Sequence, residues 1–526
     1  MYDISILTRL NINDFKLISC SILIGCVLLQ GCERSPKKTY AENITINDCW
    51  FEQKDDWPLA ECGVLLVPEN YSKPDGREVK LPFIIFKATE PDQKTYPLVV
   101  AGGGGPGGAL GIAEENKRTF NDTAWLGWYS STIEAGRDLV LIDNRGVGSS
   151  EPRLDCYEVE KADMDSLNKH LNIEDVIKIT KESFGDCKQR LVDQGIDLSQ
   201  YHVVNAARDL EELRIGLGLD QLNVYGISYG TRVALELERR YPDSVRSLIL
   251  DGIYPQSVKA YEDAPRHDSE AITRVINKCQ EESECFSQFG FNLEESFTTF
   301  LKQLDEKPVT ISMTSPVDYQ PIDVVVTSDI FFDSLFAMIY DEYAIAYIPK
   351  YMYSTFKGNT DLLTEMVRDY YVNDIVIDPM DAGAYVSYSC FDEIPFIDYT
   401  VARDEIKKYP YQHYSSKYAI EIVKTLCEVW DVPAAASDFK DEYTIDTPVL
   451  IYSGELDPVT PAEFAKPVIK NARKSWHMEW PNIAHGVMYT SDCSDWTAGA
   501  FLGNPESDPF VYECSDEPRM LDFEIR

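Results

Sequence analysis

Short apolar runs bounded by turn residues recur along the chain and alternate with helical patterns. Helical spacing is found, for example, at 206–219 and 231–242. Several of the apolar runs are almost continuously hydrophobic, as is typical of parallel strands covered on both faces. The alternation therefore predicts an α/β sheet. Its predicted strands lie within 63–68, 80–88, 96–105, 137–146, 221–226, 246–252, 447–454 and 475–480.

The alternation of strands and helices is interrupted between residues 256 and 445, where the spacing is mainly helical. We therefore predict a core formed by 32–255 and 446–526, with 256–445 inserted as a helical cap. One stretch of this cap, 329–353, is rich in aromatic residues. Its helical face is predicted to belong either to the protein core or to the lining of a pocket. That face contains Phe332, Leu335, Phe336, Ile339, Tyr340 and Tyr343.

An uncharged apolar run at 17–29 follows Lys16 and ends close to Cys32. The run is shorter than the roughly 20 residues of a transmembrane helix and suits the core of a secretory signal. The Leu-Gln-Gly-Cys motif after it resembles that of bacterial lipoproteins, in which the cysteine is acylated. We therefore predict a lipoprotein signal peptide at 1–31 and an exported chain that Cys32 anchors to a bacterial membrane, facing the periplasm or the cell surface. A plain cleaved signal and a short anchor are the alternatives.

The net charge limits which partners the protein can bind, and the cysteine content indicates the cellular compartment. The formal charge of −39 opposes binding to nucleic acid. Three of the 13 cysteines lie in the signal region, and an even set of ten in an exported chain indicates disulfides. No cysteine or histidine spacing matches a metal site, so we expect neither a metal nor a cofactor. The ten cysteines fall into the neighbouring pairs Cys49/Cys62, Cys156/Cys187, Cys279/Cys285, Cys390/Cys427 and Cys493/Cys514.

A serine between two glycines, at 226–230, lies between a predicted strand and a predicted helix. In the turn called the nucleophile elbow, glycines two residues before and after the serine let the flanking backbones pass closely. The helix that follows directs N–H groups and its positive dipole end toward the site. Because both the strand and the helix are present, Ser228 is predicted to be a nucleophile and not merely a small turn residue.

A serine nucleophile needs a base, and the base needs a third group that orients it. In this arrangement the acid follows one late strand and the histidine follows the next. Asp457 comes just after one predicted strand, and His485 follows the last one. Of the six histidines, His477 lies within that last strand and the other four precede Asp457. The predicted triad is therefore Ser228, His485 and Asp457.

A glycine-rich turn follows the predicted strand within 96–105. Residues 103–108 fit the G-x-G-x-x-G pattern of dinucleotide sites, but no convincing acidic ribose partner or companion unit follows them. In hydrolases of this kind, a turn at this place supplies one half of the oxyanion hole. The predicted donors to the oxyanion are the backbone N–H groups of Tyr229 and of Gly105 or Gly104.

These segments together resemble the prolyl iminopeptidase and tripeptidyl aminopeptidase group of α/β-hydrolase serine peptidases. The resemblance covers nearly the whole mature chain, although Gly103 stands where a histidine often opens the glycine turn. It implies an α/β-hydrolase fold, with a mostly parallel sheet, helices on both faces and an inserted helical cap. The matching segments are 103–108, 143–150, 206–218, 225–252, 453–461 and 484–486.

The resemblance also implies an activity, that of an exopeptidase that removes one or a few residues from a peptide with a free N-terminus. Family members commonly bind the amine with carboxylates of the cap, and Asp392 and Glu393 are the candidates in this chain. The alternative for this pair is a solvated acidic surface beside a disulfide. An esterase on the same fold and a non-catalytic binding lipoprotein are the other functional hypotheses. The sequence leaves the oligomeric state open.

Overall fold

The computed structural model describes residues 40–525 except for 56, 91–95, 104, 113–128, 291, 342, 377–379, 417–418, 489 and 511–520. The described residues lie in one structural unit, Tyr40–Arg526. The predicted signal segment and Cys32 are outside the described residues, so the lipid anchor stays a prediction. None of the helices in the described part of the chain is both long and apolar enough to cross a membrane.

A mixed sheet of nine strands forms the centre of the structure. The first four strands in spatial order pair antiparallel, and all later neighbours pair parallel. All eight predicted strands are present, and the short edge strand β1 is an addition to the prediction. In spatial order the strands are β1 (Ile44–Asn47), β2 (Ala60–Pro68), β3 (Glu78–Phe86), β5 (Leu139–Ile142), β4 (Leu98–Ala101), β6 (Leu222–Ile227), β7 (Val245–Asp251), β10 (Val449–Gly454) and β11 (Ser475–Trp480).

Alternate residues of the sheet belong to two different hydrophobic cores because successive side chains of a strand point to opposite faces. In β4, Val99 and Ala101 share a core with Val233 of α5, whereas Leu98 and Val100 pack with residues of α18. Both faces of the sheet are therefore covered, as the continuous apolar runs predicted. The helices outside the β7–β10 interval are α2 (Tyr157–Met164), α3 (Ile173–Asp193), α4 (Val203–Gly216), α5 (Tyr229–Arg240), α17 (Lys466–Asn471) and α18 (Asp492–Gly503).

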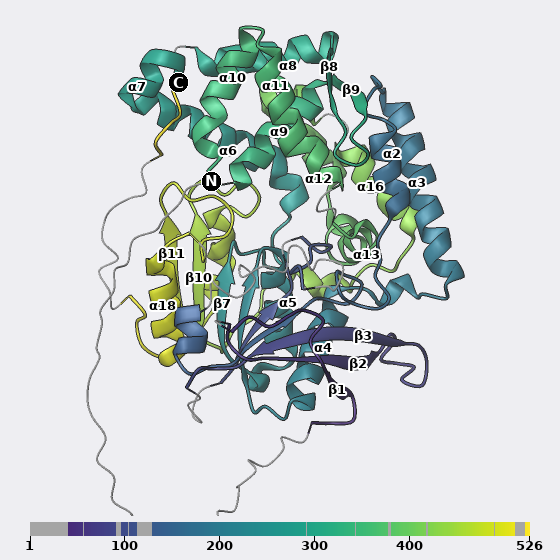
Figure 1. Cartoon of the computed structure of the whole chain (residues 1–526), viewed down its shortest axis with the longest axis vertical. Helices are drawn as coiled ribbons and strands as arrows, with labels where there is room; N and C mark the ends of the chain where they lie inside the picture. The colour runs from purple at the N-terminus through teal and green to yellow at the C-terminus, as the bar shows by residue number, and fades with distance from the viewer. Residues whose placement is uncertain are drawn as a thin grey trace, which may run out of the picture. The chain divides into compact units, whose positions relative to one another are not determined.

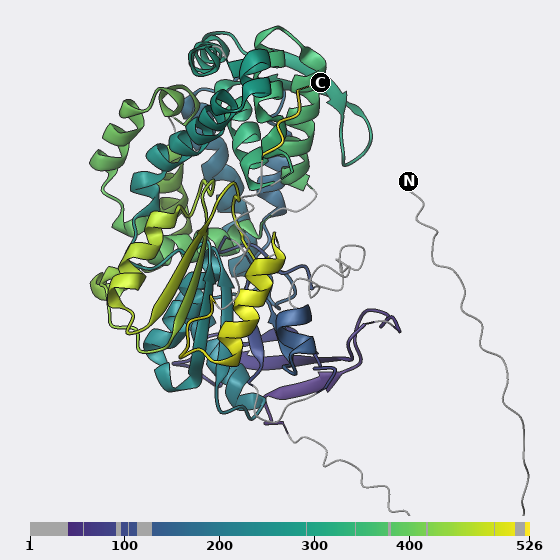
Figure 2. The ribbon, with the colours of Figure 1, turned by 90° about the vertical axis from the view of Figure 1, so that its left-hand side faces the viewer.

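The interval between β7 and β10 is mainly helical. Its buried residues between 271 and 372 form most of a second hydrophobic core, whereas those between 384 and 430 belong mainly to the core that includes Val99 and Val233. In both views most of the teal and green helices of this interval lie at the top and the purple strands β1–β3 lie near the bottom, whereas α13 (Ala382–Asp392) lies lower, beside the sheet, in Figure 1 (Figures 1 and 2). The interval also contains an antiparallel hairpin that the sequence did not predict, formed by β8 (Val309–Thr314) and β9 (Pro321–Val326). The cap boundaries at 256 and 445 remain a prediction.

The helices of this interval vary from one turn to six turns in length. They are α6 (Ala260–Glu281), α7 (Ser283–Cys285), α8 (Leu293–Glu306), α9 (Ser328–Tyr340), α10 (Ile348–Phe356), α11 (Thr360–Val367), α12 (Asn373–Val376), α13 (Ala382–Asp392), α14 (Tyr399–Lys408), α15 (Pro410–Ser415) and α16 (Ala419–Trp430). A π-helical turn, η7 (Arg368–Val372), joins α11 to α12. Two of these helices, α6 and α9, contact one another and contribute to the site described below.

Candidate active site

Ser228 lies in a sharp turn between β6 and α5. Its backbone has φ 54° and ψ −123°, a conformation that is strained for a residue other than glycine. A Cβ on Gly226 would lie 2.4 Å from the carbonyl oxygen of Gly230, and one on Gly230 would lie 2.7 Å from that of Ala101. Both glycines are thus required by close backbone contacts, as the predicted nucleophile turn demands.

Asp457 and His485 follow β10 and β11 and are in direct contact. His485 Nδ1 lies 2.8 Å from Asp457 Oδ2. Since an ionised carboxylate can only accept, this bond places the proton on Nδ1 and leaves Nε2 free to accept one. Thr460 donates its N–H to Asp457 Oδ1 at 2.8 Å and its hydroxyl to Oδ2 at 2.7 Å. Asp457 is therefore held in place from two sides.

The charges of this pair favour its ionised forms. Burial alone would lower the pKa of His485, but the charge and hydrogen bond of Asp457, together with the charge of Asp251, raise it above its ordinary value. Burial alone would raise the pKa of Asp457, yet His485 and the Thr460 bonds hold it below its ordinary value. The acid is thus suited to stabilise a positive imidazolium.

Asp251, at the end of β7, joins the serine turn to the histidine turn, a role that the sequence did not reveal. Its backbone carbonyl accepts the N–H of Ser228 at 2.9 Å. Its carboxylate accepts the N–H groups of Val487 and Met488, each at 2.9 Å. One buried residue therefore fixes the turn that carries Ser228 and the turn that carries His485.

A cavity of about 1180 Å³ brings the predicted catalytic side chains together. Ser228, His485 and Gly105 line it from the core. The hydrogen bonds between described residues do not include one from Ser228 to His485, a bond that often tightens only when substrate is present. The other side of the cavity is formed mainly by α6, α9 and η7.

The predicted oxyanion donors lie beside Ser228. Tyr229 is the first residue of α5, where backbone N–H groups have no partner within the helix. Gly105 lines the cavity with φ 63°, and Gly104 is outside the described residues. Asp143 stabilises the loop after these glycines by accepting the N–H of Leu110 at 2.7 Å. The donor roles themselves stay a prediction.

The acidic pair Asp392 and Glu393 is buried, so the alternative of a solvated surface pair is wrong. Arg232 Nη1 lies 3.3 Å from Asp392 and 2.8 Å from Glu393, and Lys440 also donates to Glu393. The hydroxyl of Tyr229 donates to Asp392. Neither carboxylate is among the described residues that line the cavity. The amine-binding role of this pair stays a prediction, and a substrate ammonium would have to compete with Arg232 and Lys440.

The acidic residues that do line the cavity are a different set, which the sequence did not single out. They come from α2, α6, α9 and the turns near η7. As far as the structure describes the lining, it contains no lysine or arginine. Where these carboxylates are ionised the cavity favours a positively charged ligand, although Asp369 is already paired with Arg368 at 2.7 Å. These residues are Asp163, Asp268, Asp333, Asp341 and Asp369.

Four of the five expected cysteine pairs are disulfide bonds in the structure. They are Cys49–Cys62, Cys156–Cys187, Cys279–Cys285 and Cys390–Cys427. Cys493 is also disulfide-bonded, but Cys514 is outside the described residues. Disulfides of this number are typical of exported proteins.

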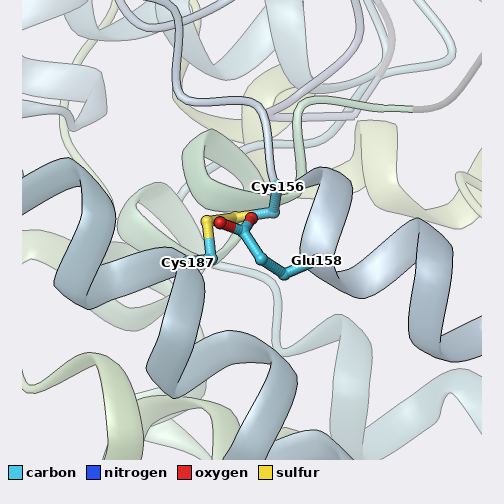
Figure 3. Close-up of side chains that lie close together, drawn as sticks. All are labelled: Cys156, Glu158 and Cys187. Atoms are coloured by element: carbon cyan, nitrogen blue, oxygen red, sulfur yellow. A yellow bond between two sulfur atoms is a disulfide. The ribbon is translucent and has the colours of Figure 1, made fainter.

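The side chains of Cys156, Cys187 and Glu158 are close enough together to suggest a metal site (Figure 3). The two sulfur atoms are bonded to one another, so neither is a thiolate that could bind a metal. The Glu158 carboxylate accepts a hydrogen bond from Arg190 at 2.6 Å. This group is therefore a disulfide with a neighbouring ion pair.

Two parts of the chain match known families. Residues 98–319 match the family described as alpha/beta hydrolase fold, and residues 411–514 match the family described as TAP-like protein. The first match includes Ser228, and the second includes Asp457 and His485 of the predicted triad.

Three relatives cover different shares of the chain. Serine protease Hip1 of Mycobacterium tuberculosis is 25% identical over 94% of this chain and 95% of its own. Tripeptidyl aminopeptidase of Streptomyces coelicolor is 30% identical over 39% of this chain and 37% of its own. Carboxylesterase B of Mycobacterium tuberculosis is 29% identical over 39% of this chain and 38% of its own. Together with the sheet order and the turn at Ser228, these matches show that the chain is a serine hydrolase with the α/β-hydrolase fold.

Proposed function

We propose that the protein is a serine exopeptidase that cleaves peptides from a free N-terminus. Ser228 Oγ attacks the scissile carbonyl carbon while His485 Nε2 takes its proton, and Asp457 stabilises the resulting imidazolium. The N–H groups of Tyr229 and Gly105 donate to the oxyanion. His485 then gives the proton to the leaving amine, and water releases the N-terminal fragment from Ser228.

The observation that carries this proposal is the shared cavity of Ser228 and His485, whose described lining has five aspartates and no lysine or arginine. An N-terminal ammonium is the positive charge that every free peptide has. The relatives named serine protease and tripeptidyl aminopeptidase support peptide bonds as the target.

The test compares hydrolysis of a free-amine peptide, its N-acetylated form and a simple ester. We expect Ser228→Ala and His485→Ala to reduce turnover by several orders of magnitude, because triad members act as a unit. We also expect acetylation of the substrate to abolish cleavage. The alternative is an esterase, which the likeness to carboxylesterase B favours over part of the chain. Equal cleavage of acetylated peptides and esters would support the esterase and contradict the exopeptidase.

The proposal extends to location, with the chain exported and anchored through an acylated Cys32. The disulfides support export, since cytosolic thiols are kept reduced. Expression of Cys32→Ala in a bacterial host should release soluble, active enzyme. Retention of that variant on carbonate-washed membranes would contradict the lipid anchor.

A further inference from the structure

Two neighbouring helices of the helical interval, α13 and α14, each begin after an aspartate at the N-cap position, but the two side chains have different partners. Asp398 accepts the N–H groups of Thr400 and Val401 in the first turn of α14, as an N-cap aspartate normally does. Asp381 makes no such bond to the first turn of α13, and it is only 2% exposed. Its buried carboxylate therefore does not serve its own helix.

The carboxylate of Asp381 binds the core of the hydrolase fold instead. Its Oδ2 accepts the backbone N–H of Gly148 at 2.7 Å, and its Oδ1 accepts the Nε–H of Arg153 at 2.6 Å. Both partners come from the segment after β5, 233 and 228 positions before Asp381 in the sequence. Burial raises the pKa of Asp381 to about 6, and the charge of Arg153 and the Gly148 bond keep it from rising further. The carboxylate is therefore ionised at neutral pH, where both of its bonds are charge-assisted.

The backbone of Asp381 contacts the glycine turn that contains Gly105. Its N–H donates to the carbonyl oxygen of Gly107 at 3.0 Å, and a Cβ on Gly107 would lie 2.6 Å from the carbonyl oxygen of Asp381. Gly108 closes the same turn by donating its N–H to the carbonyl oxygen of Gly105 at 3.2 Å. Asp381 therefore holds a four-residue turn whose first residue is the predicted oxyanion donor.

The residue before Asp381 contacts the predicted donor itself. Met380 lines the catalytic cavity, and its sulfur would lie 2.8 Å from a Cβ built on Gly105. Gly105 has φ 63°, a conformation that glycine adopts far more readily than other residues. Glycine also has the widest choice of backbone conformations, so a glycine-rich turn needs contacts from outside to keep one N–H in a fixed direction. Residues 380 and 381 supply such contacts at both Gly105 and Gly107.

We propose that Asp381 is a positioning residue for the oxyanion hole, through which the cap directs the Gly105 N–H toward the substrate oxygen. Its N–H binds the glycine turn while its carboxylate binds the core at Gly148, so the turn, the cap and the core are joined at one residue. This inference rests on the oxyanion step of the proposed function. It applies equally to peptides and to esters, because the attack of Ser228 produces an oxyanion from either.

The first experiment compares the steady-state kinetics of Asp381→Ala and Asp381→Asn in the full chain, with a simple ester as substrate. We expect kcat of Asp381→Ala to fall about 10- to 100-fold while KM changes less than about twofold, because an oxyanion donor acts mainly in the transition state. Asp381→Asn should lose less, since its amide oxygen can still accept the Gly148 N–H. A loss confined to KM, or an equal loss in the two variants, would overturn the proposal.

Asp398→Ala is the matched control, because it removes the N-cap carboxylate of the adjacent helix, whose bonds are to that helix. It should lower the melting temperature, since N-cap bonds stabilise helices, and leave kcat and KM unchanged. If kcat falls in both Asp398→Ala and Asp381→Ala in proportion to the lost stability, Asp381 acts only on folding and the proposal is overturned.

Gly107→Ala tests the same contact from the other side and keeps Asp381 in place. Gly107 does not have a positive φ, so its backbone suits alanine, but the added Cβ would meet the carbonyl oxygen of Asp381. We expect kcat to fall with little change in KM. The double variant with Asp381→Ala should lose less than the product of the two single losses, because both changes remove one shared contact. Losses that multiply in full would contradict the shared contact.

A boronic acid that bonds to Ser228 separates the oxyanion hole from the other catalytic groups. Its tetrahedral adduct places an oxygen in the oxyanion position, so its inhibition constant should rise in Asp381→Ala by roughly the factor by which kcat falls. An unchanged inhibition constant beside a reduced kcat would overturn the proposal. Failure of the exopeptidase proposal looks different, since wild type would then hydrolyse the ester but not free-amine peptides, and the ester kinetics would still decide the role of Asp381.

Discussion

Two pairs of acidic residues in the helical interval have opposite surroundings. Asp392 and Glu393 are 0% and 3% exposed, and both contact Arg232. Asp268 and Asp333 instead line an open cavity that, in its described lining, has no lysine or arginine. The first pair is satisfied by the protein itself, whereas the second is available to a ligand.

The difference indicates separate tasks for the two pairs. Asp392 accepts from the hydroxyl of Tyr229, the residue directly after Ser228, so it holds the start of α5 against α13. Asp268 and Asp333, called the cavity pair below, make no such contact. They raise the energy of the folded protein because their carboxyl groups lie where charge is disfavoured. Proteins retain such destabilising groups mainly where function needs them.

The largest loss of stability is expected when Arg232, the cation that contacts both Asp392 and Glu393, is replaced. Arg232→Met leaves Asp392 buried beside Glu393 without the positive charge that they share. We expect the free energy of unfolding to fall by about 3–5 kcal/mol, as for other broken buried ion pairs. Chemical denaturation would measure it. Ester turnover should also fall, because Asp392, which accepts the hydroxyl of Tyr229, loses the Arg232 contact that helps to hold it.

The control for this variant is Arg239→Met on the same helix. The Arg239 guanidinium donates to the carbonyl groups of Phe439 and Asp438 and lies over the ring of Tyr443. We expect a much smaller loss of stability there. Arg232→Met should not keep wild-type stability and mainly raise KM for free-amine peptides if Asp392 and Glu393 serve stability. That outcome would contradict the distinction between Asp392/Glu393 and Asp268/Asp333. Asp392 and Glu393 would then be the amine site, as the family resemblance suggested.

The next effect concerns the pH dependence of the cavity pair. Since the pKa of Asp333 is about 7, its carboxyl group is protonated and neutral below that pH. The kcat/KM ratio of free-amine to ester substrate should therefore fall as pH decreases, by roughly tenfold per unit below 7. The ratio cancels the titration of His485, which affects both substrates.

Other groups near the cavity pair are distinguishable in the same measurement. Asp163 of α2 titrates with a pKa of about 6, burial lowers the pKa of His267, and burial and nearby carboxylates keep Tyr371 protonated. In Asp333→Asn the fall below pH 7 should disappear. An unchanged profile in that variant would assign the fall to another group and contradict the cavity pair as the amine site.

Most of the fold and part of the site could be predicted because they depend on local sequence patterns. Continuous apolar runs predicted eight strands, and the glycines around Ser228 predicted the turn that the structure contains. Chain order after the late strands selected Asp457 and His485, which lie 2.8 Å apart. The edge strand β1 and the hairpin β8–β9 were missed because they are short and only partly buried.

The remaining site residues depend on tertiary contacts that no local pattern reveals. Asp251 acts through Val487, which is 236 positions away in sequence. Asp268 and Asp333 line the same cavity because α6 packs on α9. One signal was present, since Asp333 falls on the same helical face as Phe336 and Tyr340, and these aromatic residues line the cavity. Other members of that predicted face differ, because Leu335 and Ile339 are buried.

The smallest expected effect is a change in melting temperature. Its sign should differ between Asp333→Asn in the cavity pair and Asp392→Asn in the buried pair. Asp333 has a higher pKa in the folded protein than the ordinary 3.8, so its folded form binds more protons between those values. By linkage, its contribution to stability is present at acidic pH and is lost as pH rises toward 7.

Asp333→Asn should therefore melt roughly 1–2 °C above wild type at pH 8, with a smaller difference at pH 5, where wild-type Asp333 is already protonated. Asp392→Asn should melt below wild type at both pH values. The amide NH2 group replaces one of the two oxygens that accept from Tyr229 and Arg232, and the charge that pairs with Arg232 is lost. Thermal unfolding followed by circular dichroism would measure both, with Asp263→Asn as the control. A lower melting temperature for Asp333→Asn at pH 8 would mean that Asp333 stabilises the cap, and the two pairs would no longer differ in kind.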